Sequence, residues 1–190
     1  IVLEDEIRVS GRSKEDILED LHQILKVMER SATLHLKDES STAMNLIQGF
    51  SKRLENYATS DDTLAGKDIS HLMAMAFSTM ETNASMGKIV AAPTAGSAGI
   101  IPAILMYYRD NFTATDDDFV NALLTSTGIG HIVGRYATFA GAEGGCQAEC
   151  GAASAMGSAA LVYLKGGSVK QMLSAASITI MNVLGLVCDP

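Results

Sequence analysis

The stretch GAEGGCQAECGAASAMGSAALVYL, residues 141–164, decides the predicted fold. After Cys146 and Cys150 it consists almost entirely of Ala, Ser and Gly, and it predicts a helix over residues 147–164. Such a helix buries little side-chain surface, so it is stable mainly where neighbouring backbones approach closely. Because it is apolar on every side, we expect it to lie at the centre of a helical bundle.

The whole second half of the chain, from Met86 onward, shares this composition and is poor in charge. A Gly-Gly pair at 166–167 separates two of its helices, as a helix stop should, and Pro102 falls in the first turn of another. Charges such as Lys165 favour a soluble core over a membrane bundle of small residues. The helices predicted here cover 98–108, 116–134, 147–164 and 168–186.

The first half of the chain predicts amphipathic helices with charged outer faces. One begins at Ser13, where Ser13 and Asp16 resemble a capping box, and two more cover about 41–57 and 68–84. The only strand candidates are residues 88–92 and the first few residues. We therefore predict a mostly α protein, a compact helical bundle with small-residue central helices and few or no strands.

Composition excludes several classes of protein. The 190 residues are 47% hydrophobic and 19% charged, as in a globular protein, and their net charge of -8 argues against nucleic acid as a partner. No apolar run reaches membrane-spanning length, and no signal peptide is visible. Three cysteines, an odd number, fit thiols or metal ligands in a cytoplasmic protein better than a disulfide framework.

The segment KIVAAPTAGSAG, residues 88–99, predicts a binding turn. It runs from an apolar stretch through Pro93 into a turn of Gly, Ser and Thr, and then into a helix. Free backbone N–H groups and hydroxyls at a helix N-terminus favour an anion, either a carboxylate or a phosphate. The alternative is an ordinary helix cap made by Thr94 or Ser97.

The cysteines alone give a weak metal signal. Cys146 and Cys150 are four residues apart, which is not a common zinc spacing, and Cys188 follows in LVCDP. At a helix start, the helix dipole would favour the thiolate of Cys146. Buried structural cysteines remain the alternative. The histidines are scattered; His71 and His131 lie in apolar helices and could be core residues or line a site.

Three segments together resemble one family. They are ETNASMGKIVAAPTAGSAGIIPAIL (81–105), GAEGGCQAECGAASAMGSAALV (141–162) and NVLGLVCDP (182–190). In this order they resemble the α chain, or α domain, of bacterial iron–sulfur-dependent L-serine dehydratase. The resemblance covers residues 81–190 well and the first eighty only loosely. It implies a single helical catalytic α domain over residues 1–190, part of a longer protein that continues past Pro190, with the β domain absent.

The resemblance also implies a cofactor and a reaction. Cys146 and Cys188 match two of three cysteine ligands of a 4Fe-4S cluster, and the third is expected about ten residues beyond Pro190. Cys150 matches no required ligand and is treated as a neighbour. One open iron would act as a Lewis acid on the serine hydroxyl. Loss of water from L-serine would then give pyruvate and ammonia, in amino-acid degradation.

The same resemblance assigns the substrate-binding residues. The turn of Thr94, Ala95, Gly96 and Ser97 would bind the substrate carboxylate, and Asn83 and Lys88 would add polar contacts or charge. No catalytic base can be assigned, because the family draws a Ser-Ser-His-Thr motif from a β chain. We therefore expect a β chain and an oligomer as partners.

Other functions stay open at this point. A related hydroxy-amino acid such as threonine could be the substrate. The chain could instead be a non-catalytic carboxylate-binding or regulatory helical domain with buried structural cysteines, or a zinc-supported interaction module.

Overall fold

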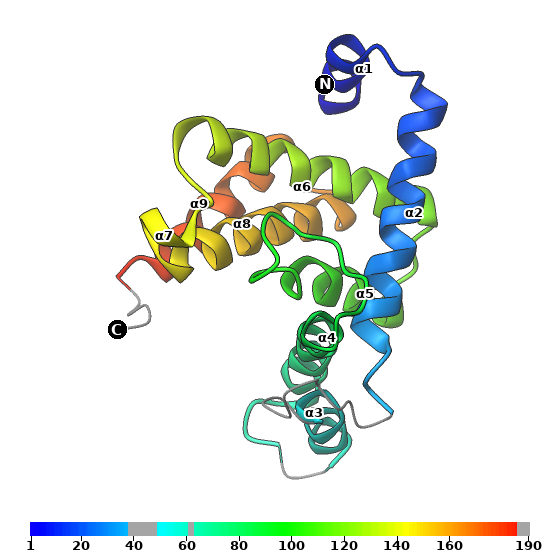
Figure 1. The fold of residues 1–190 in the computed structure, drawn as a ribbon, viewed down its shortest axis with the longest axis vertical. Helices are drawn as coiled ribbons and strands as arrows, with labels where there is room; N and C mark the ends of the chain where they lie inside the picture. Colours follow the sequence, from blue (N-terminus) through cyan, green and yellow to red (C-terminus); the bar gives the residue numbers. More distant parts are fainter. Residues whose placement is uncertain (38–48, 61–62, 186–190) are drawn as a thin grey trace. The chain divides into compact units, whose positions relative to one another are not determined.

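The fold is taken from a computed structural model that describes residues 1–37, 49–60 and 63–185 (Figure 1). These residues form nine α-helices and no strand. The mostly α fold class predicted from the sequence is therefore confirmed for the described part of the chain.

The chain divides into two compact units. The first, called the α8 unit, contains Ile1–Leu25 and Thr113–Pro190, and the second, called the α4 unit, contains Lys26–Phe112. Helix α2 (Lys14–Thr33) contributes residues to both units. The expectation of a single catalytic domain stays a prediction.

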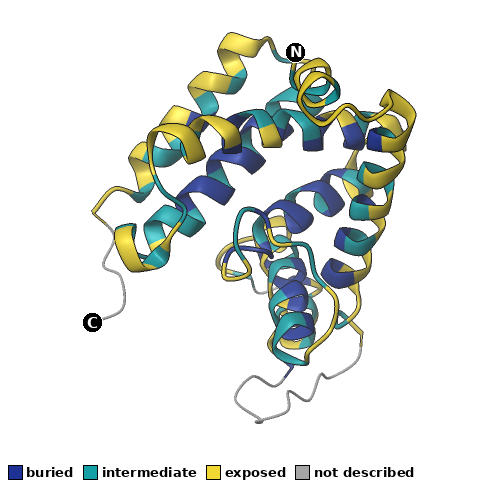
Figure 2. Cartoon of the chain, turned by 45° about the horizontal axis from the view of Figure 1, so that its top comes forward, coloured by how far each residue is buried: buried dark blue, intermediate teal, exposed yellow. Residues whose placement is uncertain are grey.

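In the α8 unit, a helix of small residues is the centre of the packing. Helix α8 packs against α6, α7 and α9, and most of its positions between Gly151 and Ala160 are buried (Figure 2). No described helix, α8 included, is long and apolar enough to cross a membrane. The helices of this unit besides α2 are α1 (Val2–Ser10), α6 (Asp116–Tyr136), α7 (Gly141–Gly144), α8 (Cys146–Leu164) and α9 (Val169–Val183).

Glycines let the neighbours of α8 come close. A Cβ on Gly151 would lie 3.0 Å from Val183 of α9, and one on Gly130 of α6 would lie 3.1 Å from the Met156 methyl group. The Ser126 hydroxyl of α6 also donates a 3.1 Å hydrogen bond to the carbonyl of Met156. Glycines therefore let α9 and α6 pack closely on two sides of α8, through the side chains of Val183 and Met156.

The sequence predicted several helix ends correctly. Ser13 accepts a hydrogen bond from the Asp16 N–H. Gly166, at φ 75, and Gly167 end α8 with bonds to the carbonyls of Tyr163 and Val162, which is a Schellman motif.

Helix α6 starts with a capping box that the sequence analysis did not identify. Thr115 and Asp118 exchange hydrogen bonds between side chain and backbone. The N–H of Thr115 first, and its hydroxyl second, lower the pKa of the Asp118 carboxyl.

The α4 unit is built around a helix whose buried face is polar. Helix α4 packs against α3 and α5, and five of its seven buried residues are Ser70, Ser78, Thr79, Glu81 and Thr82. The carbonyl of Ser31 on α2 accepts a 2.7 Å hydrogen bond from the Ser78 hydroxyl. The helices of this unit, besides the end of α2, are α3 (Phe50–Ala58), α4 (Lys67–Ala84) and α5 (Ile100–Asn111).

Three local predictions differ from the structure. The first residues form helix α1 rather than a strand, and residues 88–92 have no strand partner. The helix predicted over 168–186 ends at Val183, where Leu184 turns to an extended conformation. The helix predicted over 41–57 is described from Phe50 onward; residues 41–48 lie outside the described residues.

Gly99→Ala should destabilise the α4 unit. A Cβ at this position would lie 2.6 Å from the backbone carbonyl oxygen of Ala76 on α4. Relieving this clash would require the backbone of α4 or of the segment at Gly99 to shift. We expect the free energy of unfolding to fall by about 2–3 kcal/mol in chemical denaturation, as overpacking does.

Gly128→Ala is the matched control for this change. A Cβ on Gly128 would contact only the end of the Val2 side chain, at 3.0 Å. Gly128 lies inside α6, and Ala is more favourable than Gly in a helix interior. We expect its stability to stay within about 1 kcal/mol of the wild type. Equal losses in the two variants would contradict the role given to Gly99.

Candidate functional site

The turn predicted to bind an anion is a compact loop in the α4 unit. The hydroxyl oxygens of Thr94 and Ser97 lie 3.1 Å apart, and the Ala92 N–H donates a 3.3 Å bond to the Thr94 carbonyl. Ser97 is buried, whereas Ala95 and Gly96 are exposed. The peptide bond between Ala92 and Pro93 is cis. The turn is thus held from within and presents its tip to solvent.

This turn does not cap helix α5. The N-cap residue of α5 is Gly99, and no side chain caps it, so the alternative of a cap made by Thr94 or Ser97 is wrong. Within the described part of the chain, the backbone N–H groups of Ala95, Gly96 and Ser97 donate no hydrogen bond. Backbone N–H groups without an acceptor, next to two hydroxyl groups, can bind a carboxylate or a phosphate.

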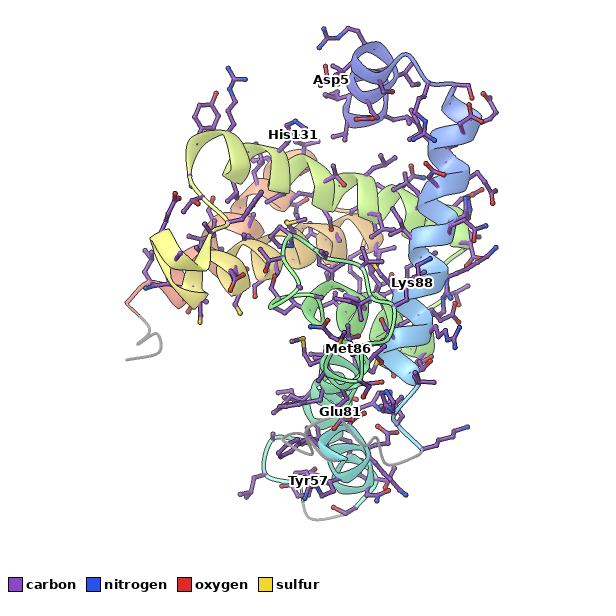
Figure 3. The ribbon with its side chains drawn as sticks, viewed as in Figure 1. Asp5, Tyr57, Glu81, Met86, Lys88 and His131 are labelled. Carbon is purple, nitrogen blue, oxygen red and sulfur yellow. The ribbon has the colours of Figure 1, made fainter. Side chains whose placement is uncertain are left out.

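Asn83 lies in the last turn of α4, and Lys88 follows where the chain leaves that helix (Figure 3 labels Lys88). The N–H groups of Met86 and Gly87 bond to the carbonyls of Asn83 and Thr82, which closes α4 with a Schellman motif. Asn83 is half-buried and Lys88 is exposed. Neither has a described hydrogen bond to the Thr94–Ser97 turn, so their predicted contact with substrate stays a prediction.

The Schellman motif at the end of α4 is unusual in its sequence. Met86 has a φ of 62 and is the only described residue other than glycine with a positive φ. Glycine normally occupies this position, because a side chain there costs about 1 kcal/mol. Its neighbour Gly87 cannot carry a Cβ, which would lie 2.7 Å from the Thr82 methyl group.

Glu81 is a buried carboxylate close to these residues that the sequence analysis missed. Its exposed fraction is 0%, and Oε1 accepts hydrogen bonds from the N–H groups of Phe50, at 2.6 Å, and Ser51, at 3.3 Å. Oε2 has no hydrogen-bond partner among the described residues. Glu81 therefore caps the N-terminus of α3 from the last turns of α4 (Figure 3).

The spacing of small residues on α4 could have identified Glu81. Ser70, Ala74 and Ser78 recur every four residues and form the buried face of the helix. Glu81 follows three residues after Ser78, so it lies on that same face. A charged residue on a small-residue face is rarely buried without a partner.

Cys146 lies at the first position of α8, as predicted, and its residue is exposed. The preceding Gly145 has φ 70 and ψ -177, a conformation that only glycine adopts readily. No side chain caps α8, whose first turn points its N–H groups toward the helix start. The glycines before Cys146 thus place its thiol at an open helix N-terminus.

Cys150 follows one turn later and is half-buried. Cys188 lies outside the described residues. No three His, Cys, Asp or Glu side chains come close enough to hold a metal ion in the part of the chain that the structure describes. Cys146 belongs to the α8 unit and the Thr94–Ser97 turn to the α4 unit.

His71 has a structural role. Its Nδ1 lies 2.5 Å from Glu55 Oε2 on α3, and its Nε2 lies 3.6 Å from Asp110 Oδ2 on α5. The ring therefore links three helices of the α4 unit. His131, on α6, is exposed and lines a hollow with Asp5 and other α1 residues (Figure 3).

Comparison with known proteins connects these features to a family. The family described as "Serine dehydratase alpha chain" matches residues 1–190, the whole chain. The chain belongs to this family. Its membership confirms the resemblance seen in the sequence and extends it to the first eighty residues, where the sequence alone showed only a loose likeness.

Individual relatives agree with this membership. The "L-serine dehydratase, alpha chain" of Peptoniphilus asaccharolyticus is 55% identical over 190 residues, which are 100% of this chain and 65% of the relative. The "Probable L-serine dehydratase, alpha chain" of Bacillus subtilis (strain 168) is 38% identical over 190 residues, 63% of its length. The chain thus spans just under two thirds of these relatives.

A third relative is much longer. The "L-serine dehydratase" of Streptomyces coelicolor is 36% identical over 186 residues, which are 94% of this chain but only 40% of that protein. The region shared with this chain is therefore part of a larger polypeptide in some members of the family.

Glu81→Ala should destabilise the α4 unit, because it leaves the N–H groups of Phe50 and Ser51 without their acceptor. We expect a loss of about 1–3 kcal/mol in the free energy of unfolding. Glu81→Gln keeps an acceptor oxygen of the same shape and should cost clearly less. Chemical denaturation of both variants tests this, and a neutral Glu81→Ala would show that the cap contributes nothing.

Proposed function

We propose that this chain is the α portion of a lyase that removes water from L-serine, giving pyruvate and ammonia. The observation that carries the proposal is the match over all 190 residues to a protein named as an L-serine dehydratase alpha chain. The Thr94–Ser97 turn supports it, since it offers donors for the carboxylate of an amino-acid substrate.

The proposed substrate contacts follow from the groups in the turn. The N–H groups of Ala95, Gly96 and Ser97 would donate to the substrate carboxylate, and the Thr94 hydroxyl would add a fourth donor. The Thr94 and Ser97 hydroxyls bond to each other, so one donates and the other accepts. The hydroxyl that accepts keeps its own O–H for a ligand. Asn83 and Lys88 would lie at the edge of this site.

The family resemblance implies a 4Fe-4S cluster. Cys146, the one proposed ligand among the described residues, has the position that such a ligand needs. Cys146 is exposed at an uncapped helix N-terminus, where a thiolate ligand is favoured. We propose Cys146 and Cys188 as ligands, with a third cysteine beyond Pro190. When bound, the cluster would supply a Lewis acid for the hydroxyl group that leaves the substrate.

The rest of this chain's contribution is positional. The small residues of α8 allow α6 and α9 to hold that helix on two sides, so the thiol of Cys146 projects from a rigid support. Gly145 sets the direction in which the chain enters α8. We also propose a β chain as the second part of the enzyme, a higher oligomer, and a cytoplasmic location.

Cys146→Ser should remove bound iron from the anaerobically purified full-length enzyme. Iron per chain and the absorbance near 400 nm, roughly where iron–sulfur charge transfer lies, should both fall several-fold. Pyruvate formation from L-serine should fall with them. Cys150→Ser is the matched control, one turn along the same helix, and should keep its iron and most of its activity.

The outcomes of that experiment separate the alternatives. A colourless wild-type enzyme that forms no pyruvate would favour a non-catalytic binding domain. Stoichiometric zinc in place of iron would favour an interaction module. Faster turnover of L-threonine than of L-serine would keep the reaction class and change the substrate.

Thr94→Ala should raise KM for L-serine about 5–30-fold with a smaller change in kcat, since it removes one donor to the proposed carboxylate site. Thr33→Ala, at the end of α2, is the control and should leave both constants unchanged. Steady-state assays of pyruvate formation give the two values. A drop in kcat alone would contradict a role of Thr94 in substrate binding.

A further inference from the structure

Helix α4 has its polar and apolar faces reversed relative to an ordinary surface helix. Most of its buried residues are Ser, Thr or Glu, whereas large apolar side chains on the opposite face are exposed. Ile69 is 56% exposed, Met73 41% and Phe77 37%. Positions 69, 73 and 77 are four residues apart, so they form one line along the helix.

Phe50 of helix α3 lies beside this line of residues. Phe50 is also exposed, and its ring centroid lies 5.7 Å from that of Phe77. The guanidinium of Arg53 lies 4.7 Å from the Phe50 ring centroid. We call Ile69, Met73, Phe77, Phe50 and Arg53 together the α4 stripe.

The composition of the α4 stripe is that of a protein interface. Aromatic residues, Met and Arg are enriched in the cores of interfaces, and the residues that contribute most to binding come from the same group. Scattered apolar residues on a surface need no explanation, but a continuous line of them on a helix whose other face is polar does.

The relatives indicate what covers the α4 stripe. From 190 residues at 65% coverage, the relative named an alpha chain has about 290 residues. From 186 residues at 40% coverage, the relative named without a chain has about 465. The difference is about 175 residues, the size of a further domain. The name "alpha chain" itself implies a second chain, which would account for that difference.

We propose that the α4 stripe is the docking surface for this second chain of the enzyme. The inference rests on the proposed function in one respect, namely that the chain acts with a second polypeptide. The partner surface would be apolar where it meets the apolar side chains of the α4 stripe.

The position of the α4 stripe within its unit fits this role. Helix α4 continues from Phe77 to Asn83 and then to Met86, whose side chain is 88% exposed (Figure 3). The segment after Met86 leads directly to the Thr94–Ser97 turn. A chain that lies along the α4 stripe and reaches Met86 would approach the proposed carboxylate site. The contact would also account for a methionine where the backbone favours glycine.

Methionine oxidation tests the proposal directly in the full-length chains. Hydroxyl-radical footprinting compares the α chain alone with the purified complex of both chains. We expect Met73 and Met86 to be oxidised in the α chain alone and protected at least about fivefold in the complex, while the buried Met75 is protected in both. Protection of Met73 in the α chain alone would overturn the proposal, because the rest of that chain would then cover the α4 stripe. Unchanged accessibility of Met73 in the complex would overturn it too.

Substitutions give a second, independent measurement. Met73→Glu and Ile69→Glu each place a charge in the α4 stripe and should weaken the complex about 10–100-fold. Met181→Glu, at an exposed position of α9, is the matched control and should leave the affinity unchanged. Circular dichroism of each isolated α chain verifies that the variants are folded. Folded α4-stripe variants that bind the second chain like the wild type would refute the proposal.

The proposed function is tested separately by the same wild-type complex. Protection of Met73 without pyruvate formation from L-serine would retain the docking surface and reject the activity. Activity together with an accessible Met73 would do the reverse.

Discussion

Close packing against glycines is the constraint on which both units depend. At Gly99 a Cβ would lie 2.6 Å from the Ala76 carbonyl oxygen, and at Gly151 it would lie 3.0 Å from Val183. Where a neighbouring element comes this near to a glycine, that position buries little side-chain surface, and stability comes from contacts over the length of the helices. A core of Ala, Ser and Gly is therefore stable only where the helices pack closely along their length.

The same constraint explains the polar interior of the α4 unit. Small hydroxyl side chains fit between close helices, and each can bond to a carbonyl of its own or a neighbouring helix, as Ser78 does with Ser31. Glu81 is the one large exception, and it is held by the N–H groups at the start of α3. With polar groups occupying most of the inner face, Ile69, Met73 and Phe77 of α4 face outward, whereas Met75 is buried.

The sequence predicted the helices well, because small-residue runs, caps and Gly-Gly stops are local signals. It also placed Cys146 at a helix start, where Gly145 provides a conformation that other residues avoid. The prediction failed where the structure of a segment depends on contacts that the local sequence does not show. Residues 88–92 are strand candidates by sequence but have no strand partner among the described residues. The cap by Thr94 or Ser97, which the sequence leaves open as the alternative to an anion-binding turn, does not form. Glu81 was missed because its partners come from a helix thirty residues away.

Helix starts in the described part of the chain differ in how their first N–H groups are satisfied. Helices α6 and α9 begin with capping boxes made by Thr115 and Ser168, which satisfy the first N–H groups with side chains. Helices α5 and α8 begin instead at Gly99 and Gly145, and no side chain caps them. An uncapped N-terminus costs stability, since its N–H groups lack partners within the helix. Helices α1 and α4 also begin without a side-chain cap, so a missing cap does not by itself mark a site. The starts of α5 and α8 differ from these because one follows the Thr94–Ser97 turn and the other carries Cys146.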